Sequence, residues 1–363
     1  MTSRIPDALA AAMAHLKTSD VSGATTAIRN VLIGGGPLSS LTHLPTTPNL
    51  SRQAGRRLGD VLNVLKIRRN GFPAPNVRPL TQPSPDDPRF TSRSLTTGVG
   101  SLNYKLYVPQ DRDRELALVL MLHGCTQDPD DFARGTQMNR LADEFGLVVA
   151  YPHQPRSANA QGCWNWFDRR HQSAGSGEPA KLAALAKTLS TEFGIARERV
   201  FAAGLSAGAA MADILAETYP EMFSKVGLHS GLPHLAAHDV MSAFAAMKGD
   251  AGVRPPDSSG RGSSKIIIHG TADPTVDQSN SDQIFERMRS RHPGSSILLT
   301  DDHTAGRKAS RQVLIDPSGN ALAEYLLIDG GRHAWSGGDR TGSFTDPSGP
   351  DASREMVSFF LRA

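Results

Sequence analysis

The hydrophobic and polar positions of this chain change their pattern near residue 90. Beyond that point, short apolar runs alternate with segments whose apolar residues recur every three or four positions, which predicts strands alternating with helices. Residues 116–122 contain no polar side chain, as expected for a strand that is buried on both faces of a parallel sheet. The pattern therefore predicts an α/β fold in which a mainly parallel central sheet is covered by helices on both faces.

The same pattern predicts bounds for the elements beyond residue 90. Strands are expected at 90–97, 102–108, 116–122, 147–151, 200–203, 225–229, 266–269 and 324–328. Helices are expected at 138–145, 179–193, 239–247, 276–291 and 353–361. Residues 232–264 interrupt the alternation with a Pro-, Gly- and Ser-rich stretch after a helix, which indicates an insertion that is either a lid or substrate wall or a plain surface excursion.

The first 89 residues differ from the rest of the chain. Apolar residues at helical spacing predict short helices at 5–17 and 20–33, with a further helix at about 57–65. Prolines are frequent from residue 37 to residue 88, which favours irregular structure over a second compact core. We therefore predict a helical and Pro-rich extension over 1–89 followed by one large domain over 90–363.

Composition narrows the classes of function. The 363 residues suffice for a large buried core, and a net charge of +3 without a dense basic block gives no indication of a nucleic-acid partner. No run of about 18 apolar residues is present, so no membrane span is expected. The N-terminus lacks a recognisable signal peptide, which predicts a cytoplasmic location, with an extracellular or periplasmic one as the alternative.

The pentapeptide Gly-Leu-Ser-Ala-Gly at 204–208 is the strongest candidate for chemistry. It stands between a short apolar run and a segment of helical character, so Ser206 is expected at a tight turn between strand and helix. Small residues on both sides of the serine suit a backbone that doubles back sharply. The pattern alone is a weak signal, and an inert helix N-cap is the alternative interpretation of Ser206.

A nucleophilic serine needs a base, and the base needs an acid that orients it. In a sheet of this kind the acid and then the base are expected after the serine, each in a loop that follows a strand. Asp273 comes directly after the predicted strand 266–269, and His333 follows the predicted strand 324–328. Asp277 is a nearby competitor for the acid.

The remaining histidines are weaker candidates. His292 and His303 also follow the acid, but they lie in polar segments without the strand-to-loop placement. His229, His234 and His238 flank the loop after the predicted strand 225–229, and no third ligand in register supports a metal site. We therefore expect no metal site.

Ester chemistry also requires N–H donors for the negative charge that develops on the carbonyl oxygen. The N–H of Ala207, directly after the serine, is the first expected donor. The second is expected in the loop after an early strand, where residues 116–122 run into His123-Gly124-Cys125. We predict the N–H of Cys125 as this second donor.

Aromatic residues gather near these segments. Trp164 and Trp166 stand before a Gly-rich stretch, and Trp335 lies two residues beyond His333. With His123, they are predicted to bind substrate, although a tryptophan equally often fills a core. The chain contains only two cysteines, Cys125 and Cys163; if their loops border one cleft, a disulfide would fix the donor loop and would indicate an oxidising compartment.

Six segments together resemble the polyhydroxybutyrate (PHB) depolymerase family of esterases over residues 90–363. These segments are His-Gly-Cys-Thr-Gln at 123–127, Cys-Trp-Asn-Trp-Phe at 163–167, Gly-Leu-Ser-Ala-Gly at 204–208, His-Ser-Gly at 229–231, His-Gly-Thr-Ala-Asp-Pro-Thr-Val at 269–276 and His-Ala-Trp-Ser-Gly-Gly at 333–338. The resemblance implies an α/β-hydrolase fold, no cofactor and hydrolysis of carboxylic esters. It also implies Ser206, Asp273 and His333 as the triad.

The resemblance leaves the substrate open. It is compatible with poly- or oligo(3-hydroxybutyrate) and related short-acyl esters, and feruloyl or acetylxylan esterases share the same core. Secreted polymer-degrading members have a signal peptide and usually a further binding domain, and neither is recognised here. A non-catalytic binding module on a hydrolase shell is the hypothesis from another class, and it is disfavoured by an intact triad in the expected order.

Overall fold

The computed structural model describes residues 87–250, 262–302 and 306–362. The predicted extension 1–89 lies outside this part of the chain except for its last three residues, as do His303 and most of the Pro- and Gly-rich part of the predicted insertion. Among the described residues, no helix is long and apolar enough to cross a membrane.

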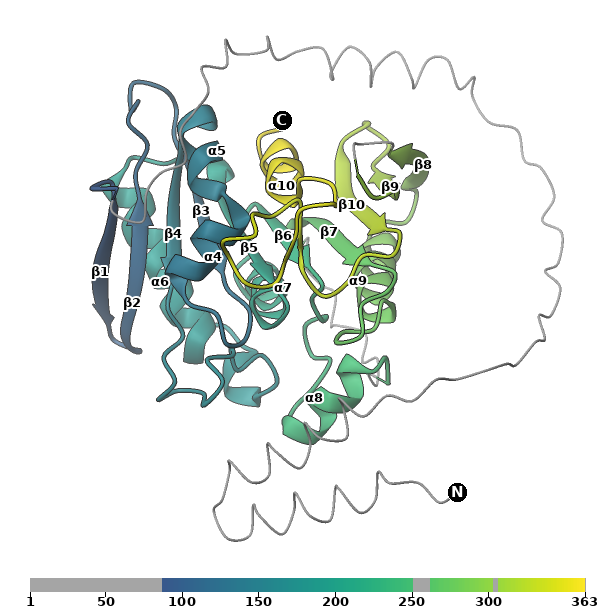
Figure 1. Ribbon diagram of the computed structural model, residues 1–363, viewed down its shortest axis with the longest axis horizontal. Coiled ribbons are helices and arrows are strands. Elements are labelled where there is room, and N and C mark those ends of the chain that lie inside the picture. Colours follow the sequence, from purple (N-terminus) through teal and green to yellow (C-terminus); the bar gives the residue numbers. More distant parts are fainter. Residues whose placement is uncertain (1–86, 251–261, 303–305, 363) are drawn as a thin grey trace, which may run out of the picture. The chain divides into compact units, whose positions relative to one another are not determined.

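A ten-stranded sheet forms the centre of the described region, with strand order β1-β2-β4-β3-β5-β6-β7-β10-β9-β8 (Figure 1). The six strands from β4 to β10 in this order are mutually parallel, and antiparallel pairs flank them at both edges. The strands are β1 (Phe90–Thr97), β2 (Gly100–Tyr107), β3 (Ala117–Leu122), β4 (Leu147–Pro152), β5 (Val200–Leu205), β6 (Lys225–His229), β7 (Ser264–Gly270), β8 (Ser296–Asp302), β9 (Ala309–Ile315) and β10 (Ala321–Ile328).

Helices cover the sheet on both faces, and each face has its own hydrophobic core. One core joins the sheet to α6, α7 and α9, and the other joins it to α4, α5 and α10, which lie in front in Figure 1. The helices are α4 (Pro129–Thr136), α5 (Met138–Phe145), α6 (Gly177–Glu192), α7 (Ala207–Thr218), α8 (Val240–Met247), α9 (Ser279–Arg291) and α10 (Ala352–Phe360), with short 3-10 turns at Arg169–His171 and Arg197–Arg199.

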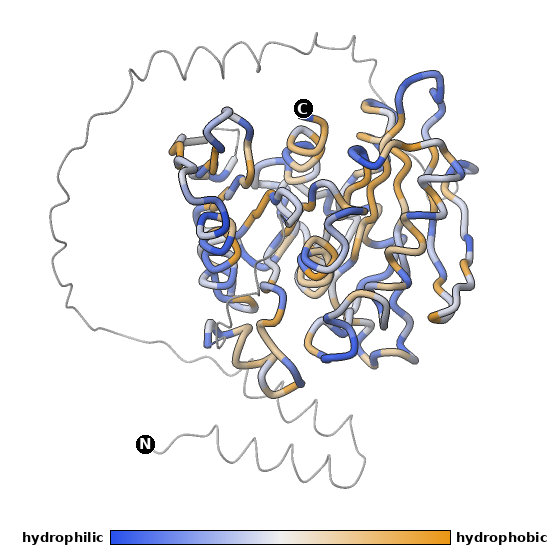
Figure 2. Tube along the Cα trace, turned by 180° about the vertical axis from the view of Figure 1, so that it is seen from behind, coloured by the Kyte–Doolittle hydropathy of each residue, from blue (hydrophilic) through white to orange (hydrophobic). Residues whose placement is uncertain are grey.

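The fully apolar run of β3 shows why the sheet needs both layers. Leu118, Leu120 and Leu122 enter one core, and Val119 and Met121 enter the other. All six residues of the strand are buried, as expected for a strand with helices on both sides. Figure 2 shows the same layering, with hydrophobic colour concentrated along the inner strands. The predicted α/β-hydrolase architecture with a mainly parallel sheet is confirmed.

Most predicted elements match an observed one within a few residues, but the sequence analysis missed α4, β8 and β9. It also missed two short strands, β11 (Trp335–Ser336) and β12 (Thr345–Asp346), which form a separate two-stranded sheet. The strands β8 and β9 form an antiparallel hairpin at the sheet edge, where Leu299 remains 70% exposed and the apolar pattern is weak. The helix α4 is short and polar, with only Phe132 and Ala133 as buried apolar side chains apart from its first proline. It begins at Asp128, whose side chain accepts a hydrogen bond from the N–H of Asp131.

Candidate active site

Ser206 lies at the turn between β5 and α7. Its backbone has φ 56° and ψ −119°, a conformation that is costly for a residue with a side chain. The turn is tight because a Cβ added to Gly204 would lie 2.4 Å from the carbonyl carbon of Gly208. A Cβ on Gly208 would lie 2.0 Å from the carbonyl oxygen of Leu122 in β3. Glycines on both sides of Ser206 are therefore required by the close approach of three backbone segments.

Asp273 and His333 meet across the loops that follow β7 and β10. The Nδ1–H of His333 donates a hydrogen bond of 2.7 Å to Oδ2 of Asp273, whose side chain is only 1% exposed. The other oxygen of Asp273 accepts from the N–H groups of Thr275 and Val276, at 2.8 and 3.0 Å. Burial by itself raises the pKa of Asp273, but the bond and charge of His333 and these two N–H groups outweigh it and lower the pKa to about 2.

The structure thus separates the two candidate acids. Asp277 lies four residues beyond Asp273, but its carboxylate accepts from the N–H of Ser279 near the start of α9 and the residue is exposed. His292 bonds the carbonyl oxygen of Met288 at the end of the same helix. The carboxylate that accepts a hydrogen bond from His333 is therefore that of Asp273, whereas that of Asp277 accepts from Ser279.

A buried histidine ties the serine turn to the loop that carries His333. The carbonyl oxygen of His229, at the end of β6, accepts from the N–H of Ser206 at 2.9 Å. Its Nε2 accepts from the N–H of Ser336 at 3.1 Å. Burial lowers the pKa of His229 to about 3, so the ring stays neutral and keeps Nε2 as an acceptor. The three histidines grouped in the sequence analysis therefore differ in role, and His229 is a structural residue of the core.

The loop after β3 lies directly beside the serine. A Cβ on Gly124 would lie 3.7 Å from Cβ of Ser206, so the loop that continues into Cys125 passes close to this serine. In the described part of the chain, the N–H of Cys125 has no hydrogen-bond partner, whereas its neighbour Thr126 donates to the carbonyl oxygen of Gln161 at 2.7 Å. The N–H of Ala207 is the first of α7, and N–H groups in the first turn of a helix have no partner inside it. Both predicted donors are therefore available to a substrate oxygen.

A disulfide between Cys125 and Cys163 joins this loop to the segment after β4, with Cα atoms 4.2 Å apart. The prediction of this bond is confirmed. Because it connects residues 38 positions apart, it fixes the donor loop against a segment that no strand pairing holds.

Two of the predicted substrate contacts, Trp335 and His123, have buried side chains. Trp335 is 1% exposed, donates its Nε1–H to Ser353 and packs edge-on against Phe132, so it belongs to the core. His123 is fully buried and its ring nitrogens face the backbone of Gly124 and Gln154. Both residues stand beside functional positions in the sequence, and that proximity was the only signal for a role in binding.

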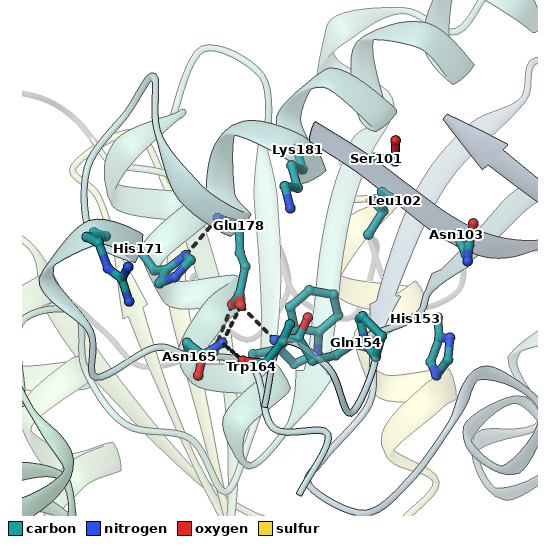
Figure 3. Close-up of a pocket in the computed structure, with 13 residues that line it drawn as sticks. Ser101, Leu102, Asn103, His153, Gln154, Trp164, Asn165, His171, Glu178 and Lys181 are labelled. Carbon is teal, nitrogen blue, oxygen red and sulfur yellow. Dashed lines mark hydrogen bonds between the residues drawn. The ribbon is translucent and has the colours of Figure 1, made fainter. Parts of the chain in front are cut away.

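Trp164 and Trp166 have more mixed surroundings. Both are largely buried, at 1% and 6% exposure, but Trp164 lines a pocket of about 240 Å³. In Figure 3 the carboxylate of Glu178 accepts from Asn165 and Gln154 at the base of this pocket. The pocket is lined by Ser101, Leu102, Asn103, His153, Gln154, Pro155, Ala158, Trp164, Asn165, Arg170, His171, Glu178 and Lys181.

Sequence reasoning missed several polar residues that support the site. His269 donates its Nε2–H to the carbonyl oxygen of Val276 at 2.9 Å, and the same nitrogen lies 3.5 Å from Oδ2 of Asp273. Gln127 and Asp131 connect the donor loop to Ser343, 216 positions from Gln127. Gln127 and His269 both lie in segments that carry the family resemblance, at 123–127 and 269–276. Each is a polar residue at or near the end of a buried strand, and this position was the signal that could have indicated a supporting role.

The comparisons with known proteins agree with this geometry. The family model described as "Esterase PHB depolymerase" matches residues 102–309, more than half of the chain. The chain belongs to this esterase family. The matched range contains Ser206 and Asp273 but ends before His333.

Two curated relatives are 29% and 28% identical to the chain over the residues that align. The first is poly(3-hydroxyalkanoate) depolymerase C of Paucimonas lemoignei, with 65% of this chain and 59% of the relative covered. The second is a probable acetylxylan esterase A of Aspergillus fumigatus, with 49% of this chain and 51% of the relative covered. The chain thus spans little more than half the length of these relatives.

Among solved structures, the acetyl xylan esterase from Aspergillus awamori has a TM-score of 0.56 at 18% sequence identity. The match covers 74% of this chain and 98% of that protein. At this identity, the likeness shows that the two proteins share a fold.

Proposed function

We propose that this protein is a serine carboxylic ester hydrolase that works through an acyl-enzyme. The oxygen of Ser206 attacks the ester carbonyl while His333 takes the hydroxyl proton, and the negative charge forms on the carbonyl oxygen opposite the N–H groups of Cys125 and Ala207. When the carbonyl is restored, the ester C–O bond breaks and His333 gives its proton to the departing alkoxide. Water then attacks the acyl-serine by the same route, which releases the acid and restores Ser206.

The hydrogen bond between His333 and Asp273 is the observation that carries this proposal. Because Asp273 accepts the Nδ1–H, the Nε2 of His333 is left without a proton and is able to act as the base. A carboxylate with a pKa of about 2 stays ionised at neutral pH, so it stabilises the imidazolium that forms during the attack. The order serine, acid, histidine along the chain is the order that this fold uses.

We propose poly- or oligo(3-hydroxybutyrate), or related short-acyl esters, as the substrate class. The family match and the depolymerase relative support this choice. An acetylxylan or feruloyl esterase is the second candidate, favoured by the relative from Aspergillus fumigatus.

The disulfide also bears on where the protein works. Disulfides persist in oxidising compartments and are rare in the cytoplasm. We therefore favour an extracellular or periplasmic location, the alternative in the sequence analysis, over the cytoplasm. Thiol labelling of the protein isolated from its natural compartment tests this proposal: unlabelled Cys125 and Cys163 are expected, and two free thiols would contradict it.

A panel of esters tests the proposed function. The purified full-length chain is expected to hydrolyse short-chain nitrophenyl esters, and to release acid from hydroxybutyrate oligomers faster than from feruloyl or acetylated sugar esters. The Ser206→Ala variant is expected to lose at least about 10³-fold in kcat, since no other group forms the acyl-enzyme. Activity of the variant near the wild-type level would overturn the mechanism, whereas a preference for feruloyl or acetyl esters would overturn only the substrate class.

A further inference from the structure

The proposed oxyanion donor at Cys125 is a backbone N–H, so its direction depends on the plane of the peptide that contains it. That peptide joins Gly124 to Cys125, and in a trans peptide the C=O and the N–H point in opposite directions. Any group that holds the carbonyl oxygen of Gly124 therefore also aims the N–H of Cys125. Glycine has no side chain to restrict its backbone, so this plane needs support from outside.

The ring of His123 provides the shorter of two contacts that give this support, and the backbone N–H of Gln127 provides the other, at 3.4 Å from the carbonyl oxygen of Gly124. The Nδ1 of the ring lies 2.8 Å from the carbonyl oxygen of Gly124, and its Nε2 lies 3.2 Å from the backbone nitrogen of Gln154. A carbonyl oxygen only accepts and a backbone N–H only donates, so the two contacts of the ring together require a proton on Nδ1 and none on Nε2. Burial lowers the pKa of His123 to about 4, which keeps the ring in this neutral form at neutral pH.

The other polar group of Gly124 is held as well. Its N–H donates to Oε1 of Gln127 at 2.9 Å, and Gln127 is 6% exposed. The amide nitrogen of Gln127 donates in turn to Asp131 at 3.0 Å and to the carbonyl oxygen of Ser343 at 3.1 Å. Asp131 also accepts from the N–H of Ser343 at 2.9 Å, so the donor loop is anchored to the segment that follows His333.

We propose that His123 and Gln127 are positioning residues that aim the Cys125 N–H at the oxyanion. The ring of His123 holds the peptide plane between Gly124 and Cys125, and the side chain of Gln127 holds the preceding peptide through the N–H of Gly124. This inference rests on the proposed ester hydrolysis. Neither side chain touches the substrate, so their effect reaches the reaction only through the direction of one N–H group. That effect is realised when negative charge develops on the carbonyl oxygen, and it is small in the bound ester.

A matched pair of variants tests the role of His123. His123→Leu removes the donor to Gly124, and His123→Asn keeps an N–H near the place of Nδ1; both remove the acceptor for Gln154. We expect His123→Leu to lower kcat on a nitrophenyl ester by about 10- to 100-fold with KM within about twofold, because a misaimed donor costs less than the 10²- to 10³-fold of a missing one. We expect His123→Asn to recover most of this loss. The exposed His238→Leu serves as the control with unchanged kinetics.

Inhibition by an alkylboronic acid provides a readout that a merely structural role would not move. The boronate adds to the serine oxygen and places an oxygen where the oxyanion forms, so its inhibition constant is expected to rise by the same factor as kcat falls. Equal losses in both His123 variants, or a loss of kcat without weaker boronate inhibition, would overturn the inference.

A second variant and the wild-type control keep the test decisive. Should circular dichroism show that His123→Leu does not fold, Gln127→Met is expected to show the same joint loss of kcat and boronate affinity, and unchanged values would overturn the inference. If wild type hydrolyses the ester and the folded variants match it, the inference fails and the proposed function stands. If wild type hydrolyses none of the esters, the proposed function itself fails.

Discussion

The two sides of Ser206 present their working groups in different ways. On the side of β7 and β10, the proposed groups are side chains: the imidazole of His333 and the carboxylate of Asp273, 2.7 Å apart. On the side of β3, the proposed group is the backbone N–H of Cys125, aimed by the side chains of His123 and Gln127 and tethered by the disulfide. A side-chain group disappears when its own residue is replaced, whereas a backbone donor survives replacement of its residue and is weakened through its neighbours.

The largest losses of kcat are expected for variants on the side of β7 and β10, where the proposed groups are side chains. Replacing His333 with Ala removes the base, and Asp273→Asn leaves the imidazole without the charge that orients it, so each is expected to lower kcat by about 10³- to 10⁴-fold. Asp277→Asn is the matched control and is expected to change kcat by less than about threefold, because its carboxylate faces the N–H of Ser279. Steady-state kinetics of the three variants on one ester checks this. A severe loss in Asp277→Asn with a mild loss in Asp273→Asn would reverse the assignment of the acid.

The backbone half is expected to tolerate replacement of the donor residue itself. The double variant Cys125→Ser, Cys163→Ser keeps the N–H at position 125 and its support by His123 and Gln127, so kcat is expected to fall by less than about tenfold. The free energy of unfolding is expected to fall by about 4 kcal/mol, since the disulfide closes a loop of some 38 residues. Urea unfolding and kinetics at a temperature where the variant is folded measure the two quantities. A loss of more than 100-fold in kcat would show that the disulfide, and not the side chains around Gly124, aims the donor.

The last expected effect is on stability rather than on kcat, and it comes from the buried neutral histidines His123 and His229. The folded-state pKa values of His123 and His229, about 4 and about 3, lie below the value of about 6.5 expected in the unfolded chain. The unfolded chain therefore takes up protons first, so the stabilisation is complete above about pH 6.5 and is lost as the pH falls toward 4. Each histidine contributes up to about 1.4 kcal/mol per pH unit in this window.

Urea unfolding at pH 7, 6, 5 and 4.5 measures this dependence. His123→Asn is expected to reduce the slope by about one histidine's share, and His238→Leu, which removes an exposed ring, serves as the comparison. A free energy of unfolding that is flat from pH 6 to pH 4.5 would contradict the buried neutral state of these rings.

The two halves also differed in how far the sequence revealed them. Ser206, Asp273 and His333 each follow a strand, and the apolar runs of β5, β7 and β10 were strong enough to place them in loops at one edge of the sheet. Asp273 and Asp277 lie in the same loop region, so only the observed hydrogen bond to His333 separates them. The strands at the polar edge of the sheet, β8 and β9, lacked such a pattern and were missed.

The side chains that support the backbone donor could not be predicted from the sequence, because their contacts are tertiary. Nothing in local spacing indicates that Gln127 meets Ser343, 216 positions away, or that Gln154 donates to His123. Proximity in the sequence was the only signal for Trp335 and His123, which flank proposed catalytic residues, and both side chains are enclosed in the core. The disulfide was predicted because the chain has only two cysteines and each stands beside a proposed site segment.

Covalent labelling of the serine tests the central claim most directly. The full-length chain is incubated with a fluorophosphonate, digested and analysed by mass spectrometry, with Ser206→Ala treated in parallel. The account predicts one adduct per chain, located on Ser206 and absent from the variant. An adduct on another residue, or no adduct on a folded wild-type chain that hydrolyses esters, would contradict it.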